Sequence, residues 1–164
     1  MAQPSTLVTA LALALAGIAG CSSSHRSGSQ LSGEDARAAL IDRNWIDVMP
    51  ARHEDRLHVY RFVPSMGGGV YQDRTLFKGN FELFTFEASS ETLRFVFPHT
   101  RERVTSRYTI EPVAGRSPFD LKLTITDDPR GPGVYFGTRA EQDRAGLTLD
   151  RLWCRQPDLC IPRP

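Results

Sequence analysis

Apolar and polar side chains alternate along two segments in the second half of the chain. In both 103–112 and 119–126, mainly apolar residues occupy every second position and polar residues fill the positions between them. A period of two with one polar face is typical of an antiparallel sheet that is wet on one side. These two segments therefore predict antiparallel strands.

The stretch 77–97 contains six of the nine phenylalanines. Aromatic and β-branched residues flank a small polar turn in it, which predicts a hairpin in the protein core. The first strand of this hairpin is apolar on both faces, with Phe81 and Leu83 on one face and Phe84 and Phe86 on the other. One face must meet the core, and the other must meet something else.

Other apolar or aromatic segments are bounded by Gly, Pro or polar turns, and they predict the remaining strands. These segments are 44–49, 56–63, 69–77, 134–139 and 147–153. Ser32–Ile41 begins with a capping serine and early acidic residues, which predicts a short helix.

The strands follow one another with short connections and without crossover helices. This order predicts an all-β fold, an antiparallel up-and-down barrel of about 8–9 strands with a short N-terminal helix. Closure also removes exposed strand edges. The same strands would permit a two-sheet β-sandwich, which is the alternative.

The composition restricts the class of protein but does not indicate a function. The 164 residues, 40% hydrophobic and 24% charged, fit one globular domain. Lys and Arg number 20 against 19 Asp and Glu, a formal net charge of +1. Without a large positive field, nucleic-acid binding is not expected.

The N-terminus carries an export signal. The uncharged apolar run 7–20 is too short to span a bilayer comfortably and ends in small residues before Cys21. We therefore expect 1–20 to be a signal peptide, although Met1–Thr6 contains no Lys or Arg. The polar Ser/Gly tract that follows is typical of a flexible tether over 21–33, and 34–164 is then the barrel domain.

The tetrad Ile18-Ala19-Gly20-Cys21 resembles the lipobox of bacterial lipoproteins. The resemblance implies that Cys21 becomes the acylated first residue of the mature protein, anchored in a membrane through its lipid. In that family an aspartate after the cysteine keeps the protein in the inner membrane. This chain has Ser22 there, so the resemblance implies delivery to the outer membrane, with the protein facing the periplasm.

Export into an oxidising compartment changes the interpretation of the other two cysteines, Cys154 and Cys160. We expect them to form a disulfide that closes a small loop near the C-terminus. A metal site would need further His or Cys ligands at short spacing, and none is near.

The mature chain also resembles the small lipocalin-like, or calycin-type, barrels of bacterial lipoproteins, over roughly residues 40–153. The features that carry the resemblance are Trp45 on the first strand, the strand meander and the aromatic interior residues. The family usually has Gly two positions before this Trp, where this chain has Arg43. The family's Trp is commonly covered by a late Arg, which would be Arg151 or Arg155; alternatively, Trp45 is an ordinary core residue.

Catalytic and cofactor motifs do not emerge from the sequence. The four histidines lack the spacing of a metal pair, and Gly67-Gly68-Gly69 lacks the following Lys-Ser/Thr of a phosphate-binding loop. We therefore predict no enzyme, no metal and no cofactor, and interpret the glycines as a turn.

Candidate ligand-binding residues depend on which face of each strand points inward. Arg61 and Arg74 would orient an anionic head group in a barrel cavity, with Tyr71 and Tyr108 as further candidates. In the alternative, which we favour, aromatic residues such as Tyr60 point inward and the arginines lie in water.

Two functions remain open. The first is a membrane-anchored lipoprotein whose barrel binds a small apolar or amphipathic ligand. The alternative is a structural or assembly lipoprotein that docks to an envelope partner protein, without ligand or catalysis. The two-faced strand Phe81–Phe86 motivates the alternative, because an exposed apolar face marks an interaction surface.

Overall fold

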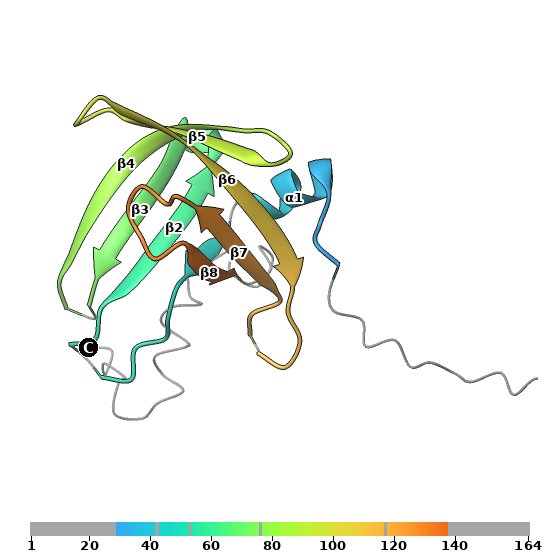
Figure 1. Cartoon of the computed structure of the whole chain (residues 1–164). Coiled ribbons are helices and arrows are strands. Elements are labelled where there is room, and N and C mark those ends of the chain that lie inside the picture. Colours follow the sequence, from blue (N-terminus) through green and yellow to red (C-terminus); the bar gives the residue numbers. More distant parts are fainter. Residues whose placement is uncertain (1–28, 42, 53, 76, 117, 138–164) are drawn as a thin grey trace, which may run out of the picture.

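A computed structural model of the chain shows a closed antiparallel barrel of eight strands in sequence order (Figure 1). The structure describes residues 29–137 apart from 42, 53, 76 and 117. The strands are β1 (Asn44–Ile46), β2 (Leu57–Val63), β3 (Gly68–Arg74), β4 (Gly79–Ala88), β5 (Thr92–Phe97), β6 (Glu102–Pro112), β7 (Leu121–Thr126) and β8 (Val134–Gly137).

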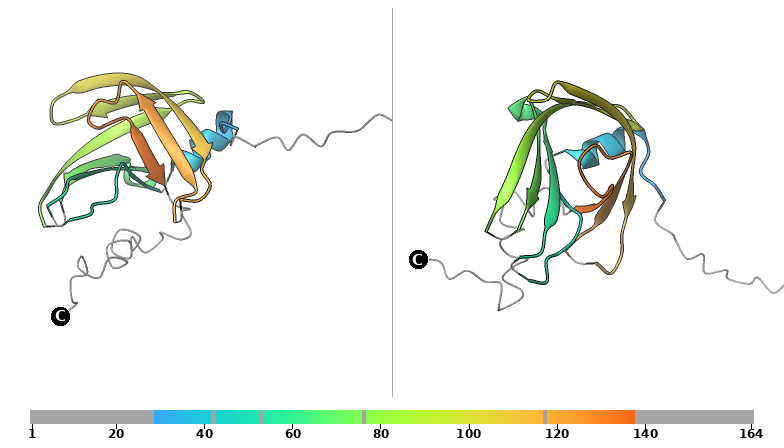
Figure 2. Two further views of the ribbon diagram at one scale, coloured as in Figure 1. Left: turned by 60° about the horizontal axis from the view of Figure 1, so that its bottom comes forward. Right: turned by 60° about the vertical axis from the view of Figure 1, so that its left-hand side comes forward.

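Pairing between β1 and β8 closes the sheet, with Trp45 opposite Gly137 and Ile46 opposite Phe136. All the remaining pairs join strands that follow one another in the sequence, and all of them are antiparallel. The predicted up-and-down barrel is therefore confirmed, and the sandwich alternative is not what forms. Figure 2 shows the strands curving around one common interior.

The predicted N-terminal helix is also present, as α1 (Gly33–Leu40). The carbonyl of Ser32 accepts the N–H of Asp35 at 3.0 Å, so Ser32 stands at the helix start. Ala36 and Leu40 are buried and join the core. The helix thus packs on the barrel through one face, beside β6.

Two strands end earlier than the alternation predicted. β1 stops at Ile46 because the Asp47 carboxylate accepts the N–H groups of Val48 and His58, each at 2.7 Å, and turns the chain out of the sheet. β3 stops at Arg74, so Phe77 lies in a turn rather than in the core hairpin. The predicted strand 147–153 lies outside the described residues.

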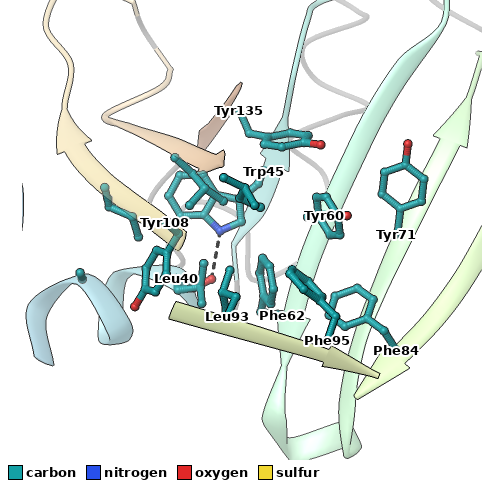
Figure 3. Close-up of a cluster of buried hydrophobic side chains, with 14 of the residues drawn as sticks. Leu40, Trp45, Tyr60, Phe62, Tyr71, Phe84, Leu93, Phe95, Tyr108 and Tyr135 are labelled. Atoms are coloured by element: carbon teal, nitrogen blue, oxygen red, sulfur yellow. Dashed lines mark hydrogen bonds between the residues drawn. The ribbon is translucent and has the colours of Figure 1, made fainter. Parts of the chain in front are cut away.

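Aromatic side chains fill the barrel interior (Figure 3). The Phe84 ring lies 5.7, 5.5 and 5.4 Å from the rings of Tyr60, Phe62 and Phe95, in the edge-on contacts that aromatic pairs prefer. Small eight-stranded barrels have an interior that side chains can fill, and this one is packed in that way.

Trp45 lies completely buried at the start of the barrel. Its indole N–H donates to the carbonyl of Leu40 at 3.0 Å, which ties β1 to the end of α1 (Figure 3). Its ring lies against Gly137, where a Cβ would stand 2.8 Å from the indole carbons. Arg43, two positions before Trp45, forms an ion pair with Asp120 at 3.0 Å.

Candidate functional site

Four large apolar side chains lie in solvent on the outer flank of β3 and β4. They are Met66 (83% exposed), Phe77 (66%), Phe81 (74%) and Leu83 (62%), and they form what we call the β3–β4 patch. The described chain exposes two other large apolar residues, Val48 (51%) between β1 and β2 and Val134 (37%) on β8, and both are less exposed than the four. The apolar exposure is therefore concentrated on one flank.

Alternation along β4 produces this patch. Phe84 points inward and is 2% exposed, so Phe81 and Leu83 must point outward. Met66 comes from the short helix η1 (Pro64–Met66) between β2 and β3, and Phe77 from the turn between β3 and β4. Both ends of the β3 strand thus contribute one apolar side chain to the same flank.

A groove of about 520 Å³ runs along this flank. Its lining residues are Met66, Val70, Gln72, Arg74, Phe77, Lys78, Gly79, Asn80, Phe81 and Leu83. A second hollow of about 290 Å³ shares Met66, Val70 and Leu83 with it and extends to Pro98. The larger volume falls within the range of sites for small molecules.

Glycines make the close approach of β3 and β4 possible. A Cβ on Gly68 would stand 2.1 Å from the carbonyl oxygen of Phe84, and one on Gly69 would stand 2.5 Å from its ring. Gly67 has a φ of 80° and ends η1 in the left-handed region. Gly67 therefore lies in a turn, as the sequence predicted, whereas Gly68 and Gly69 belong to β3 and allow its close contact with β4.

The polar residues of the groove are cationic or neutral. Arg74 and Lys78 line it, and its ten lining residues include no Asp or Glu. Arg61 stands opposite Val70 in the β2–β3 pairing and so adjoins the groove on the outer face. The flank thus combines apolar side chains with a basic border.

Most of the acidic residues of β3 and β4 point away from the face that carries the groove, and they form ion pairs with arginines. Asp73 accepts hydrogen bonds from Arg56, and Glu82 accepts one from Arg130 at 2.6 Å. Glu87, further along β4, pairs with Arg94 at 3.4 Å. Negative charge near the groove is therefore either turned away from it or neutralised.

Inside the barrel, the tyrosine hydroxyls are used by the fold. Tyr71 donates to the carbonyl of Arg130 at 2.7 Å, and Tyr108 donates to the carbonyl of Ser89 at 2.8 Å. Burial raises the pKa of both hydroxyls, so both remain protonated donors at neutral pH.

The four predicted ligand residues accordingly do not converge. Tyr71 and Tyr108 lie in the packed interior, whereas Arg61 and Arg74 lie on the outer side. Tyr60 and Phe62 of β2 point into the barrel, as in the alternative in which aromatic residues point inward and the arginines lie in water. Of the four residues, Arg74 alone lines the groove.

The segment 127–133 between β7 and β8 closes one end of the barrel around Asp128. The Asp128 carboxylate accepts the hydroxyls of Tyr60 at 2.9 Å and Tyr135 at 2.6 Å, and the N–H groups of Arg130 and Gly131 at 2.9 and 3.0 Å. Burial, followed by the charge of Asp128, raises the pKa of both tyrosines, which keeps them as donors.

Arg130 fastens the same segment to the barrel wall. Its guanidinium donates to Glu82 at 2.6 Å and to Glu102 at 2.7 Å, and its central carbon lies 3.8 Å from the centre of the Phe97 ring. Hydrogen bonds to β4 and β6 and a cation–π contact with β5 therefore hold this segment in place.

Other predicted features lie outside the described residues, namely Cys21, Cys154, Cys160, Arg151 and Arg155. Within the described part of the chain, no three His, Cys, Asp or Glu residues are grouped so that they could hold a metal ion. None of its helices has the length and apolar character needed to cross a membrane.

Comparison of the chain with known proteins finds no relative. No protein-family model, no curated protein and no solved structure matches the chain. The eight-stranded antiparallel barrel is compatible with the lipocalin-like fold that the sequence resembles.

The sequence divided β4 into two apolar faces but did not show which one points outward, and it did not show the whole patch. Met66, Phe77 and Lys78 were missed, because the first belongs to a glycine-rich turn and the others to a segment predicted as strand. A signal was available in Thr75, whose hydroxyl accepts the N–H groups of Phe77 and Lys78 and so forms a turn.

Proposed function

We propose that the protein is a non-catalytic, lipid-anchored envelope protein that docks through the β3–β4 patch. The observation that carries the proposal is the concentration of Met66, Phe77, Phe81 and Leu83 on one flank, each at least 62% exposed. Exposed apolar groups clustered in this way mark interaction sites, whereas scattered ones do not.

The packed interior supports an outer site over an inner one. A ligand inside the barrel would have to displace buried rings such as Tyr60, Phe62 and Phe95, which are 0% exposed. It would also have to pass α1 or the segment 127–133, which is held by Asp128 and Arg130. The outer groove needs neither change.

Docking would operate through side chains. In the closed barrel β3 is paired with β2 and with β4 along its length, so it offers no free edge to an incoming strand. Recognition therefore rests on the apolar patch and on the basic residues Arg61, Arg74 and Lys78 beside it.

The envelope location rests on the predicted acylation of Cys21. Two or more acyl chains hold a protein durably at a membrane, with each buried methylene contributing about 0.8 kcal/mol. Replacement of Cys21 by Ser should release the protein from the membrane fraction of cells. Unchanged fractionation of this variant would contradict the anchor.

Photo-crosslinking in cells tests the docking function. A photoreactive residue in place of Phe81 should give one dominant adduct, with either a protein or lipid. The matched control is Thr105, which is exposed on β6 and lies away from the groove lining. Similar diffuse adducts from both positions would argue against a docking surface.

A small amphipathic ligand in the groove is the second candidate. The groove volume of about 520 Å³ would accept an apolar chain, and Arg74 with Lys78 would bind an anionic head group. Native mass spectrometry of the chain without acyl groups should then detect a co-purified ligand that is lost in Arg74→Glu. A spectrum of the bare chain would count against this candidate.

A further inference from the structure

We propose that the β3–β4 patch rests on the surface of an anionic bilayer, with its apolar side chains at the acyl boundary and its cations among the head groups. This inference rests on the docking function proposed above and names the surface that covers the patch. The occupant is lipid carrying negative head groups.

The shape of the patch suits a lipid surface. Its apolar side chains run along the flank from Met66, before β3, to Phe77, after it, with Leu83 and Phe81 on the neighbouring strand. Aromatic and aliphatic side chains arranged in this way can enter the boundary between head groups and acyl chains together.

Three backbone N–H groups of the leading turn are already paired. The hydroxyl of Thr75 accepts the N–H groups of Phe77 and Lys78 at 3.3 and 3.2 Å, and the N–H of Thr75 donates to the carbonyl of Lys78 at 2.7 Å. Polar backbone groups are costly in an apolar medium unless they are paired. The turn can therefore present Phe77 to lipid at little cost from its backbone.

The charges favour lipid over a neutral protein partner. Arg74 and Lys78 line the groove, and Arg61 adjoins it. On the outer faces of the next strands, Arg94 is paired with Glu87 and adds no net charge, whereas Arg103 is a further exposed cation. Cations around an apolar centre are what a surface with anionic head groups attracts.

The predicted anchor is compatible with this orientation. The chain from Cys21 to Leu31, whose N–H donates to the carbonyl of Ile110 at 2.8 Å, reaches at most about 35 Å when it is extended. A tether of that length allows the barrel to turn its β3–β4 flank towards the membrane that holds the acyl chains.

Vesicle binding tests the inference without the anchor. The mature chain, 21–164 with Cys21→Ser, is mixed with vesicles of phosphatidylcholine alone or of phosphatidylcholine with phosphatidylglycerol, and the bound fraction is measured by flotation. We expect binding to the vesicles that contain phosphatidylglycerol, weakened by added salt because the charges are exposed. Vesicles of phosphatidylcholine alone should bind less.

Matched variants show whether the patch is responsible. Phe77→Ser with Phe81→Ser should weaken binding on the order of tenfold or more, because two exposed rings no longer enter lipid. Val48→Ser, which removes a 51% exposed apolar side chain from the connection between β1 and β2, should leave binding unchanged. Arg74→Glu with Lys78→Glu should abolish the preference for phosphatidylglycerol, and Arg37→Glu on α1 should not.

The outcomes separate this inference from the docking function. Failure to bind either kind of vesicle, or binding that survives loss of both phenylalanines, overturns the lipid proposal. If crosslinking from position 81 then gives a single protein adduct, docking stands and its partner is a protein. If crosslinking also gives no dominant adduct, both proposals fail.

Discussion

At the scale of single residues, β4 shows how one strand divides its side chains between two environments. Phe81 is 74% exposed and Phe84 is 2% exposed, although the two side chains are chemically identical. They are three positions apart, so they lie on opposite faces of the strand. The sequence separated the two faces by alternation. Which face is the core depends on Tyr60, Phe62 and Phe95, whose rings meet Phe84 inside the barrel.

This division predicts opposite effects for two similar substitutions. Phe84→Ala should destabilise the protein by about 3–5 kcal/mol, because it removes a packed ring and leaves a cavity. Phe81→Ala should change the free energy of unfolding by less than about 0.5 kcal/mol, as surface substitutions usually do. Urea unfolding of both variants measures the difference, and comparable losses would place both rings in the core.

At the scale of elements, the described strands appear where alternation placed them, but their ends do not. The ends depend on individual hydrogen bonds, such as those that Asp47 accepts after β1 and Thr75 accepts after β3. Hydrophobic periodicity contains no signal for such bonds, so 44–49 and 69–77 were predicted too long. Because 69–77 was predicted as one strand, the exposed position of Phe77 in the following turn was not predicted.

The segment 127–133 lies between the predicted strands 119–126 and 134–139, and its larger role could not be read from its local sequence. Asp128 accepts a hydrogen bond from Tyr60, 68 residues earlier, and Arg130 donates to Glu82, 48 residues earlier. Only closure of the barrel brings these residues together. A segment that looks like an ordinary Gly/Pro turn therefore seals one end of the core.

Loss of the Asp128 carboxylate should loosen this seal. Asp128→Ala leaves the Tyr60 and Tyr135 hydroxyls and two N–H groups without their acceptor, which should cost roughly 2–3 kcal/mol. Hydrogen exchange at Arg130 and Gly131 should become faster. The control is Thr126→Ala at a neighbouring exposed position. Unchanged exchange and stability in Asp128→Ala would show that the carboxylate does not hold the segment.

At the scale of the whole molecule, closure determines what the protein presents to its surroundings. The strand pattern was compatible with a sandwich as well as a barrel, and the choice is made by pairing between residues as distant as Trp45 and Gly137. The candidate site likewise unites η1, a turn and β4. The sequence separated the two faces of β4 and named Arg74 as a candidate for the barrel interior, but it did not show the outer groove that Arg74 lines.

The filled interior also predicts how the whole molecule responds to alkaline pH. Burial raises the pKa of all four tyrosines, so the folded state keeps their protons above the ordinary value near 10, whereas the unfolded chain releases them. The unfolded state then binds fewer protons, and the free energy of unfolding should fall as pH rises above about 10, by about 1.4 kcal/mol per pH unit for each tyrosine.

Below that pH the tyrosines contribute no pH dependence, because both states are protonated. Urea unfolding at a series of pH values should therefore show a loss that begins near pH 10. Tyr60→Phe with Tyr135→Phe should reduce the slope, because two of the four groups no longer titrate. A slope that is the same in this variant and in the unaltered chain would mean that groups other than Tyr60 and Tyr135 cause the alkaline loss, and that these two tyrosines ionise as readily in the barrel as in water.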